Sequence, residues 1–512
     1  MDNKAVREND FGYHWLPKMD DGKAYSTMHL FDKMYEGKIK GFFCIGADNA
    51  VSTPNTGKVR KALEKLDWLI GENIFDNETY QFWRGPGVDT KNIKTEVFLL
   101  PASASMEKEG SISNSGRWVQ WKQKACDGPD QCIPVGEIEI KIMDAVKKLY
   151  AKEGGVCPEP ILNLYWDYLD EESHFSATKT AHRINGVFLE DTVIEDKAKG
   201  TMTLFKKGQL VPTFGNLQAD GKTACGNWCY SGSYTADGIN KMKLRGKEDP
   251  TGLGLFPNWS FAWPVNRRIL YNRCSVNLNG KPYNPKRNIL EWKGDKWVGD
   301  VPDGPWPPQA DKAKGKYPFI MQRDGLGAFF GQNMADGPFP EHYEPLEGPL
   351  TKNPMSGQLI NPAIEIFDKH SDVDKIARAS EKFPYVCTTY SCTEHWCSGA
   401  LTRWQAWLLE MQPELYVEIG DQLAEKLGIK NGDKVKVASV RGEAPCVAMV
   451  TQRLVPFTIE GKTVHQVGMP FNYGWLYPEG GSDSTNFLTP TVGDANVFCP
   501  EYKAFMVNVT KL

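Results

Sequence analysis

The densest group of reactive side chains in the sequence lies between Thr388 and Gly399. The stretch reads TTYSCTEHWCSG, so hydroxyls, thiols, a carboxylate and an imidazole occur among aromatic rings. A nucleophile pair of Cys392 or Cys397 with His395 is one chemistry that these residue types permit, but a third group to orient the imidazole cannot be identified. A lone histidine is more often a hydrogen-bonded structural residue than a ligand. The stretch is therefore the best candidate binding site, with its chemistry left open.

Two loops have residues suited to an anion. Residues 46–55 (GADNAVSTPN) follow a short apolar run and precede an expected helix, which is where α/β sheets bind phosphates. Residues 107–118 (EKEGSISNSGRW) place small hydroxyl and amide groups between glycines, with Arg117 available for an anion. Each stretch is equally compatible with an ordinary polar loop. The sequence leaves both interpretations open.

The twelve cysteines lack the spacing of an iron–sulfur ligand set. No C-x2-C-x2-C or C-x2-C-x3-C run occurs. Cys225 and Cys229 could form half of a zinc site, but no second pair with similar spacing lies nearby. Free structural thiols are the simpler interpretation. We assign no metal ligand and no catalytic residue in this chain.

Composition limits the classes of partner. Of 512 residues, 24% are charged and 41% hydrophobic, as in globular proteins. The 60 basic and 64 acidic side chains give a net charge of −4, so we expect no nucleic-acid partner. No stretch approaches the roughly 18 apolar residues of a membrane span. Residues 1–10 are charged and lack an apolar segment, so we expect no signal peptide or twin-arginine leader in this chain.

The elements that position these residues divide the chain into three segments. Residues 1–156 combine apolar strands with amphipathic helices in the strand–helix–strand order of a doubly wound α/β domain. The expected strands are 39–46, 68–70 and 96–101, and the expected helices are 56–66, capped by Asn55 or Thr56, and 137–152.

Residues 157–374 are rich in Pro, Gly and aromatic residues and lack periodicity, so we expect an irregular insertion that wraps another part or lines a cleft. Residues 375–512 are β-rich. The expected elements there are strands 415–419, 434–439 and 445–451, helix 421–427 and a turn at 431–433. Short paired strands with one brief helix favour a closed barrel.

Four motifs together resemble the large subunit of molybdenum- or tungsten-dependent formate dehydrogenases, in the dimethyl sulfoxide reductase superfamily. The resemblance is to the carboxyl-terminal half of that subunit and covers essentially the whole chain. It is carried by residues 107–118, by 252–268 (GLGLFPNWSFAWPVNRR) with 271–273, by 486–489 (NFLT) and by 500–503 (PEYK). This combination of motifs is specific to the family.

The resemblance implies two molybdopterin guanine dinucleotides, containing Mo or W, bound between the α/β domain and a carboxyl-terminal double-psi β-barrel. The positions that match the family's cofactor-facing motifs are Gly46, Asn49, Glu78, Thr79, Thr389, Glu394, His395, Trp396, Thr402, Asn486 and Lys503. One departure is Tyr390-Ser391, where many superfamily members have Gly-Arg. A cationic contact to the cofactor is therefore missing there or supplied elsewhere.

The implied activity is oxidation of formate to carbon dioxide with two-electron transfer at the metal. The 4Fe-4S cluster, the metal ligand and the substrate-orienting arginine of the family belong to the half that precedes these residues. We therefore expect that half and an iron–sulfur electron-transfer subunit as partners, and an isolated chain without activity. The alternatives are a non-catalytic cofactor carrier or assembly module, or an interaction protein without cofactor. The choice of Mo or W, the electron acceptor and the cellular compartment (periplasmic for many relatives) stay open.

Overall fold

The computed structural model describes residues 25–196, 200–246, 258–262, 275–286, 288–299, 341–479 and 482–512, together with 15, 248, 335 and 336. Most of the 252–268 motif and all of 271–273 lie outside the described residues. Contacts divide the chain into two compact units, residues 1–18 with 103–329 and residues 19–102 with 330–512. The three-segment division made from the sequence stays a prediction.

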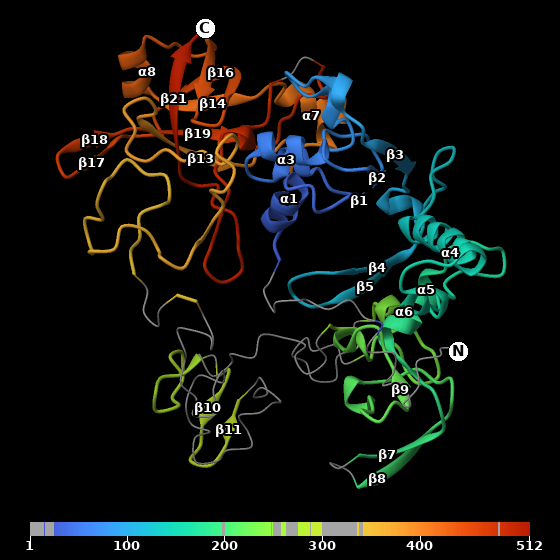
Figure 1. The fold of residues 1–512 in the computed structure, drawn as a ribbon. Coiled ribbons are helices and arrows are strands. Elements are labelled where there is room, and N and C mark those ends of the chain that lie inside the picture. Colours follow the sequence, from blue (N-terminus) through green and yellow to red (C-terminus); the bar gives the residue numbers. More distant parts are fainter. Residues whose placement is uncertain are drawn as a thin grey trace. The chain divides into compact units, whose positions relative to one another are not determined.

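The larger unit, residues 19–102 with 330–512, contains a parallel three-stranded sheet. Its order is β1 (Gly41–Ile45), β2 (Trp68–Asn73), β3 (Glu96–Pro101). Helices α1 (Thr27–Tyr35) and α3 (Thr56–Leu63) pack on one face of it through a common core (Figure 1).

Asn55 caps α3 by accepting a hydrogen bond from the N–H of Lys58, as one of the two predicted caps. The mixed α/β class and the parallel strands are confirmed. In a doubly wound domain helices cover both faces of the sheet. The described helices of this unit pack on one face, so the doubly wound arrangement stays a prediction.

The same unit contains a closed six-stranded barrel, as the alternating pattern predicted. The order around it is β13 (Tyr385–Tyr390), β19 (Gln466–Pro470), β14 (Tyr416–Gly420), β16 (Glu443–Thr451), β15 (Lys434–Ala438) and β21 (Phe505–Lys511). Two pairs are parallel, β13 with β19 and β14 with β16, and the others are antiparallel. Helix α8 (Asp421–Leu427) has the predicted bounds.

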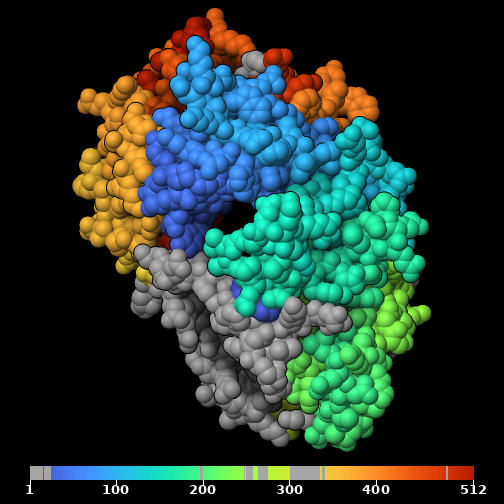
Figure 2. All heavy atoms as spheres, turned by 45° about the vertical axis from the view of Figure 1, so that its right-hand side comes forward, coloured from blue at the N-terminus to red at the C-terminus, as the bar shows by residue number. Residues whose placement is uncertain are grey.

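Shorter elements connect these parts of the larger unit. They are α2 (Asn49–Ser52), η2 (Phe82–Arg84), η3 (Thr90–Asn92), β12 (Glu365–Ile366), η10 (Thr402–Trp404), α7 (Ala406–Met411), β17 (Phe457–Ile459), β18 (Lys462–Val464), η11 (Thr485–Phe487) and β20 (Val492–Gly493). In Figure 2 the blue surface of residues 25–102 borders on the orange and red surface of the barrel segment. The sheet and the barrel therefore form one packed body.

The other unit, residues 1–18 with 103–329, combines helices with two-stranded sheets and irregular stretches in its described part. Its elements are η4 (Ser105–Glu107), β4 (Gly110–Ser113), β5 (Val119–Lys122), α4 (Val135–Glu153), α5 (Pro158–Leu162), α6 (Ala177–Asn185), β6 (Val187–Phe188), β7 (Thr192–Asp196), β8 (Thr201–Phe205), η5 (Phe214–Asn216), β9 (Thr223–Ala224), η6 (Trp228–Tyr230), η7 (Lys241–Lys243), β10 (Glu291–Trp292) and β11 (Trp297–Val298). Helix α4 includes the whole predicted helix 137–152. Throughout the described residues, no helix combines the length and the apolar character of a bilayer span.

Candidate functional site

The loop after β1 begins with Gly46, whose backbone conformation is one that favours glycine over other residues. Gly46 has a φ of +65°, where a side chain would be strained, and its N–H donates to the Glu72 carbonyl at 2.8 Å. Asn49 starts α2 and uses its side chain locally: Nδ2 donates to Cys44 Sγ at 3.5 Å and Oδ1 accepts from Thr53 Oγ1 at 3.3 Å. These two predicted site residues shape the loop at the carboxyl end of β1.

The loop after β2 is tied to the loop after β1. Thr79 Oγ1 donates to Asp48 Oδ1 at 3.0 Å and accepts from the Ala50 N–H at 3.0 Å. The Thr79 N–H also donates to Asp48 Oδ1 at 3.2 Å. Because the carboxyl ends of neighbouring parallel strands meet at one sheet edge, this juxtaposition follows from the topology. The structure thus brings Gly46, Asn49 and Thr79 together.

Glu78 joins the sheet to the barrel by a buried ion pair that the sequence did not reveal. Arg403 Nη1 and Nη2 donate to Glu78 Oε1 and Oε2 at 2.8 and 3.0 Å. The Leu476 N–H donates to Glu78 Oε1 at 3.1 Å, and Arg403 also donates to the Tyr477 carbonyl. Both Glu78 oxygens are therefore engaged. Arg403 directly follows Thr402, so the pair also places this predicted residue beside the sheet.

Asp48 is a buried carboxylate with an incomplete set of partners. Burial raises its pKa well above the usual range, and the neighbouring Glu78 carboxylate raises it further. Its Oδ1 accepts from Thr79, whereas Oδ2 has no hydrogen-bond partner among the described residues. A buried polar atom without a partner costs about 1–3 kcal/mol. The raised pKa favours a protonated Asp48 carboxyl in the chain alone, and a ligand that donates a hydrogen bond to Oδ2 would favour the ionised form.

Further unpartnered polar atoms lie in the same region. Arg60 donates through Nη2 to Asp483 at 3.1 Å, and its guanidinium lies 4.9 Å from the Trp475 ring and 4.7 Å from the Phe487 ring. Within the described part of the chain, the buried side-chain atoms here without a hydrogen-bond partner are Asp48 Oδ2, Thr56 Oγ1, Arg60 Nη1, Arg403 Nε, Trp475 Nε1 and Asn486 Oδ1. Native structures leave few such groups unsatisfied. Their concentration marks the sheet–barrel junction as a place for a polar ligand.

Barrel residues hold α2 from the other side of the junction. Asn486 Nδ2 donates to the Val51 carbonyl at 2.8 Å, and Tyr502 Oη donates to the Ser52 carbonyl at 2.8 Å. Three predicted site residues, Thr389, Asn486 and Lys503, meet here. Thr389 Oγ1 donates to the Tyr502 carbonyl at 3.1 Å, and the exposed Lys503 ammonium donates to Thr389 Oγ1 at 3.3 Å.

His395 is a structural residue in the stretch that looked most reactive. Its Nδ1 bonds to Thr402 Oγ1 at 3.2 Å and its Nε2 to the Gln412 carbonyl at 2.8 Å. Burial lowers the pKa of the imidazole, so it is neutral at pH 7. With both nitrogens engaged, His395 pairs with neither Cys392 nor Cys397. The structure does not support the nucleophile-pair hypothesis.

The remaining residues of this turn lie apart from α2. Asn472 Nδ2 donates to the carbonyls of His395 and Cys397 at 3.2 and 2.7 Å and so fixes the turn. Glu394 is half-buried and Trp396 is 64% exposed. Within the described ranges neither side chain has a hydrogen bond to the groups around α2.

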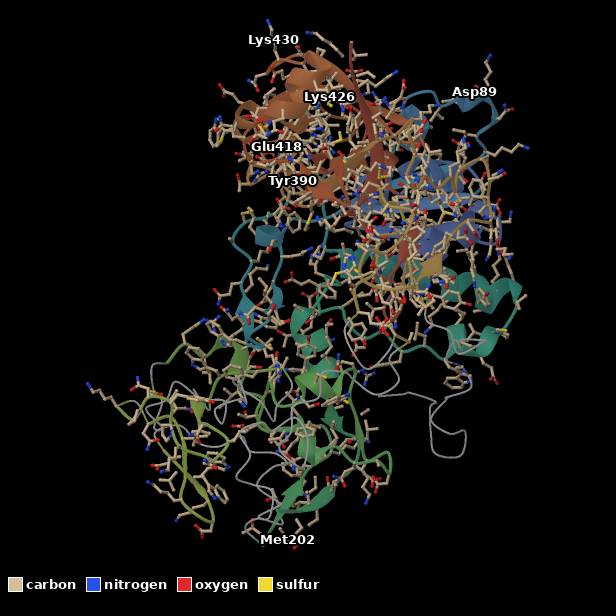
Figure 3. All side chains as sticks on the ribbon, turned by 90° about the vertical axis from the view of Figure 1, so that its left-hand side faces the viewer. Asp89, Met202, Tyr390, Glu418, Lys426 and Lys430 are labelled. Carbon is tan, nitrogen blue, oxygen red and sulfur yellow. The ribbon has the colours of Figure 1, made fainter. Side chains whose placement is uncertain are left out.

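Arg453 lies beside Tyr390, a position at which this chain differs from the Gly-Arg of many superfamily members. Tyr390 Oη donates to Glu418 Oε2 at 3.0 Å, and the two residues are adjacent in the barrel (Figure 3). Arg453 Nε donates to Glu418 Oε1 at 2.8 Å, and its guanidinium lies 5.8 Å from the Tyr390 ring. Arg453 therefore supplies positive charge next to Tyr390, on the exposed side of the barrel.

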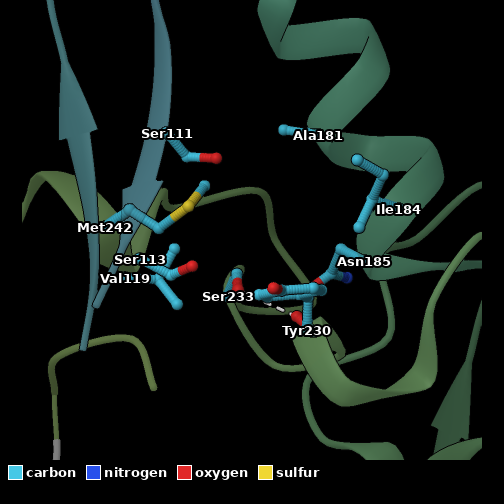
Figure 4. A pocket seen from close by; sticks show the side chains of 9 residues that line it. All are labelled: Ser111, Ser113, Val119, Ala181, Ile184, Asn185, Tyr230, Ser233 and Met242. Atoms are coloured by element: carbon cyan, nitrogen blue, oxygen red, sulfur yellow. Dashed lines mark hydrogen bonds between the residues drawn. The ribbon is translucent and has the colours of Figure 1, made fainter. Parts of the chain in front are cut away.

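The serine-rich loop lines a hollow in the other unit (Figure 4). The cavity has a volume of about 260 Å³, and its lining residues are Ser111, Ser113, Val119, Ala181, Ile184, Asn185, Tyr230, Ser233 and Met242. Ser111 and Ser113 lie on the same face of β4. The lining has no charged side chain, and Arg117 is not part of it. Its hydroxyls suit an uncharged polar molecule better than the anion that Arg117 suggested.

The residues missed from the sequence are chiefly long-range partners. Arg403 and Glu78 are 325 positions apart, and no local pattern pairs them. Asn472 donates through Nδ2 to the His395 and Cys397 carbonyls and accepts through Oδ1 from the Cys392 N–H, at a position that carries no motif of its own. Tyr502 lies in the 500–503 motif, but its contact with Ser52 was not predicted. Asp48 is different, because it lies between two predicted site residues. Its place in the loop was a signal that could have identified it.

Comparisons with known proteins agree with this geometry. Residues 385–506 match the family described as Molydopterin dinucleotide binding domain. The chain is 53% identical over 99% of its length to formate dehydrogenase 2 subunit alpha (cytochrome c-553) of Nitratidesulfovibrio vulgaris, 49% identical over 98% to formate dehydrogenase subunit alpha of Megalodesulfovibrio gigas, and 44% identical over 100% to the formate dehydrogenase-O major subunit of Escherichia coli. In each case the match covers 49% of the relative. The chain thus spans about half the length of the curated relatives it matches.

Proposed function

Because the chain is homologous along its length to formate dehydrogenase alpha subunits and fits the carboxyl-terminal half of such a subunit, we propose that it is the cofactor-binding part of a formate dehydrogenase catalytic subunit. Its cofactor would be molybdopterin guanine dinucleotide with Mo or W. The observation that carries this proposal is the group of unpartnered buried polar atoms at the sheet–barrel junction. They lie in the unit that contains the molybdopterin dinucleotide-binding domain.

The junction residues fit such a dinucleotide chemically. A guanine base presents N–H donors, and Asp48 Oδ2 and Asn486 Oδ1 are acceptors without partners in the described structure. Phosphates are acceptors, and the unpartnered Arg60 Nη1 and Trp475 Nε1 are donors. Lys503 adds an exposed ammonium, and a charge-assisted hydrogen bond from it would contribute about 1.5–3 kcal/mol. These residues, with the loop from Gly46, would hold the cofactor.

When bound, the cofactor supplies the redox chemistry that converts formate to carbon dioxide, a proton and two electrons. The chain's own part is to bind and orient. Thr79 and Asn486 fix α2, and the Arg403–Glu78 pair holds the barrel against the sheet. Such fixed groups lose little freedom when a ligand binds, which favours affinity.

The complete subunit would also need an electron-transfer group and a protein ligand for the metal. We infer that the 4Fe-4S cluster and the metal's protein ligand belong to the other half of the subunit, and that an iron–sulfur subunit accepts the electrons. The half-length match supports this division. The closed barrel with two parallel pairs supports a double-psi topology, and the parallel sheet supports membership of a doubly wound domain. The chain alone is expected to show no turnover.

Co-expression tests this proposal. The chain is produced in a host that makes the cofactor, with and without the unmatched half of the Nitratidesulfovibrio vulgaris subunit. GMP released by acid, metal content by mass spectrometry and formate-dependent dye reduction are then measured. We expect GMP in the complex, and formate oxidation only when both halves are present. Absence of GMP from the purified complex, or turnover by the chain alone, would refute it. GMP without turnover in the complete complex would favour a cofactor carrier.

A further inference from the structure

The turn between β15 and β16 contains a buried arginine that donates to three separate segments of the chain. The Arg441 side chain is 2% exposed. Its Nε and Nη2 donate to the Leu488 carbonyl at 3.0 and 2.6 Å, and its Nη1 donates to the Lys375 carbonyl. Nη1 and Nη2 also donate to Glu347 Oε1 and Oε2 at 2.7 and 2.9 Å. A planar guanidinium with partners in all these directions has little freedom to turn.

Glu347 holds this arginine in place. Its side chain is fully buried, and each of its oxygens accepts a second hydrogen bond, from the Ala377 N–H at 2.8 Å and from the Met506 N–H at 3.1 Å. These donors offset the cost of burying the carboxylate. The ion pair is therefore anchored in β21 through Met506 and in the segment before the barrel through Ala377.

The glycine that follows Arg441 admits an aromatic ring. A Cβ at Gly442 would come within 2.0 Å of the Phe487 ring, so a larger residue would displace the ring. At the opposite edge of the ring, a Cβ at Gly57 on α3 would come within 2.7 Å. The guanidinium of Arg60, also on α3, lies 4.7 Å from the centre of the same ring. Phe487 is therefore held between the barrel and α3.

Residues 484–489, here named the 484–489 turn, are tightly hydrogen-bonded among themselves. The N–H groups of Phe487 and Leu488 donate to the carbonyls three residues earlier, at 2.9 and 3.0 Å. The Asn486 N–H donates to Ser484 Oγ at 3.1 Å. Because these bonds join the residues into one unit, the contacts of Arg441 with Leu488 and of Gly442 with Phe487 also restrict Asn486.

Two unpartnered groups of the junction depend on this turn. Asn486 belongs to it and has an unpartnered acceptor, Oδ1, and Arg60 packs on it and has an unpartnered donor, Nη1, among the described residues. The side-chain nitrogens of Arg441 all have acceptors of their own. Arg441 is thus placed to act on a ligand through its neighbours.

We propose that Arg441, backed by Glu347, is a positioning residue for the dinucleotide site: it fixes the 484–489 turn, so that Asn486 Oδ1 and Arg60 Nη1 are in place before the ligand binds. Groups that are ordered in advance lose less freedom on binding, which favours affinity. This inference rests on the proposed function for the identity of the ligand. The order of the turn itself can be measured without a ligand.

A paired substitution separates positioning from stability. Arg441→Met with Glu347→Gln removes both charges together, so no unpaired ion stays buried, but the Leu488 carbonyl loses its donors. Hydrogen exchange of a peptide covering residues 484–489 is measured in the full chain without cofactor. We expect exchange to be at least about tenfold faster in the double variant, as for loss of a hydrogen bond to a charged group. Its circular dichroism should match that of the wild type.

Retained cofactor is then measured as GMP in the co-expressed complex. We expect the double variant to lose GMP several-fold faster than the wild type during dialysis. Leu423→Ala is the stability control, because it removes a buried side chain from the barrel core at a residue outside this hydrogen-bond network. It should neither speed exchange of the 484–489 turn selectively nor speed loss of GMP.

A second pair of variants acts on the same turn through the Phe487 ring. Gly442→Ala should displace the ring and speed both exchange and GMP loss. Gly357→Ala, where a Cβ would meet nothing within 4 Å, is its matched control and should change neither.

The proposal is overturned if exchange of the turn is unchanged in the Arg441→Met, Glu347→Gln variant, if GMP is retained despite faster exchange, or if Leu423→Ala shows the same two changes. Absence of GMP from the wild-type complex would count against the proposed function, and exchange of the turn would then decide alone whether Arg441 fixes it.

Discussion

The barrel and the parallel sheet belong to one unit, but among the described strands only those of the barrel form a closed sheet. Every barrel strand is paired on both sides, and its core residues Val417, Val435 and Phe505 are 0% exposed. Within the described residues, the outer strands β1 and β3 of the sheet each pair on one side only, and the Phe98 ring on β3 is 44% exposed. A cofactor placed at their junction would therefore contact a closed barrel on one side and an open sheet on the other. Affinity and stability should respond differently to changes on the two sides.

The largest contrast is expected between two phenylalanines. Phe505→Ala removes a fully buried ring from the barrel core and should destabilise it by about 3–5 kcal/mol. Phe98→Ala, on β3, should cost far less in the isolated chain, because its ring is already 44% exposed. Hydrogen exchange of barrel and sheet peptides measures both effects locally. Equal losses would mean that the Phe98 ring is packed as tightly as the Phe505 ring and that the contrast is wrong.

The second-largest effect on stability is expected for the Arg403–Glu78 ion pair between the sheet and the barrel. Arg403→Met leaves Glu78 buried without its counter-ion, and breaking a buried pair costs about 3–5 kcal/mol. We expect the lower end, about 3 kcal/mol, because the raised pKa of the neighbouring Asp48 carboxyl lets it hold a proton and so limits the negative charge left beside Glu78. Glu78→Gln with Arg403→Met should be less damaging than the single Arg403 change. Additive effects in this double-mutant cycle would show that the pair does not couple sheet and barrel.

The smallest effect concerns acid stability of the turn at His395. Its pKa is lowered by burial, so the unfolded state binds the proton more readily than the folded state. This contribution to stability is present above the unfolded pKa of about 6.5 and is lost as pH falls below it. His395→Gln should make the decline of the melting temperature between pH 7 and pH 5 less steep. An unchanged slope would indicate that His395 does not contribute.

The sequence predicted those elements whose polarity pattern lies within a few neighbouring residues. Lys434–Ala438 alternates in polarity, and the structure has it as a barrel strand with Val435 and Val437 inside. Helix α8 has the bounds that were predicted from the sequence, and Leu423 and Ala424 are its buried residues. The apolar run 39–46 predicted a strand, and the structure has β1 at Gly41–Ile45, paired in parallel with β2.

The candidate site was predicted in part. Loop residues such as Thr79 and Asn486 were identified through a family resemblance, and the structure places both at α2. The atoms that complete the junction are contributed by tertiary contacts, as in the Arg403–Glu78 pair, and no spacing along the chain encodes them. Likewise, the partner of His395 Nε2 is a backbone carbonyl. Every residue has one, so the residue types do not predict this contact.

The most direct test of the central claim, that the junction binds a molybdopterin guanine dinucleotide, is the GMP content of Asp48→Asn in the assembled protein. Asparagine resembles protonated Asp48 and keeps the acceptor for Thr79, so the fold should be as stable as the wild type. A ligand that donates to Oδ2 would bind the ionised carboxylate, and asparagine cannot adopt this form, so retained GMP should fall at least about tenfold, as for loss of a charged hydrogen bond. Asp76→Asn, in the loop after β2, makes the same charge change and should retain GMP. Equal GMP in all three proteins would contradict the account.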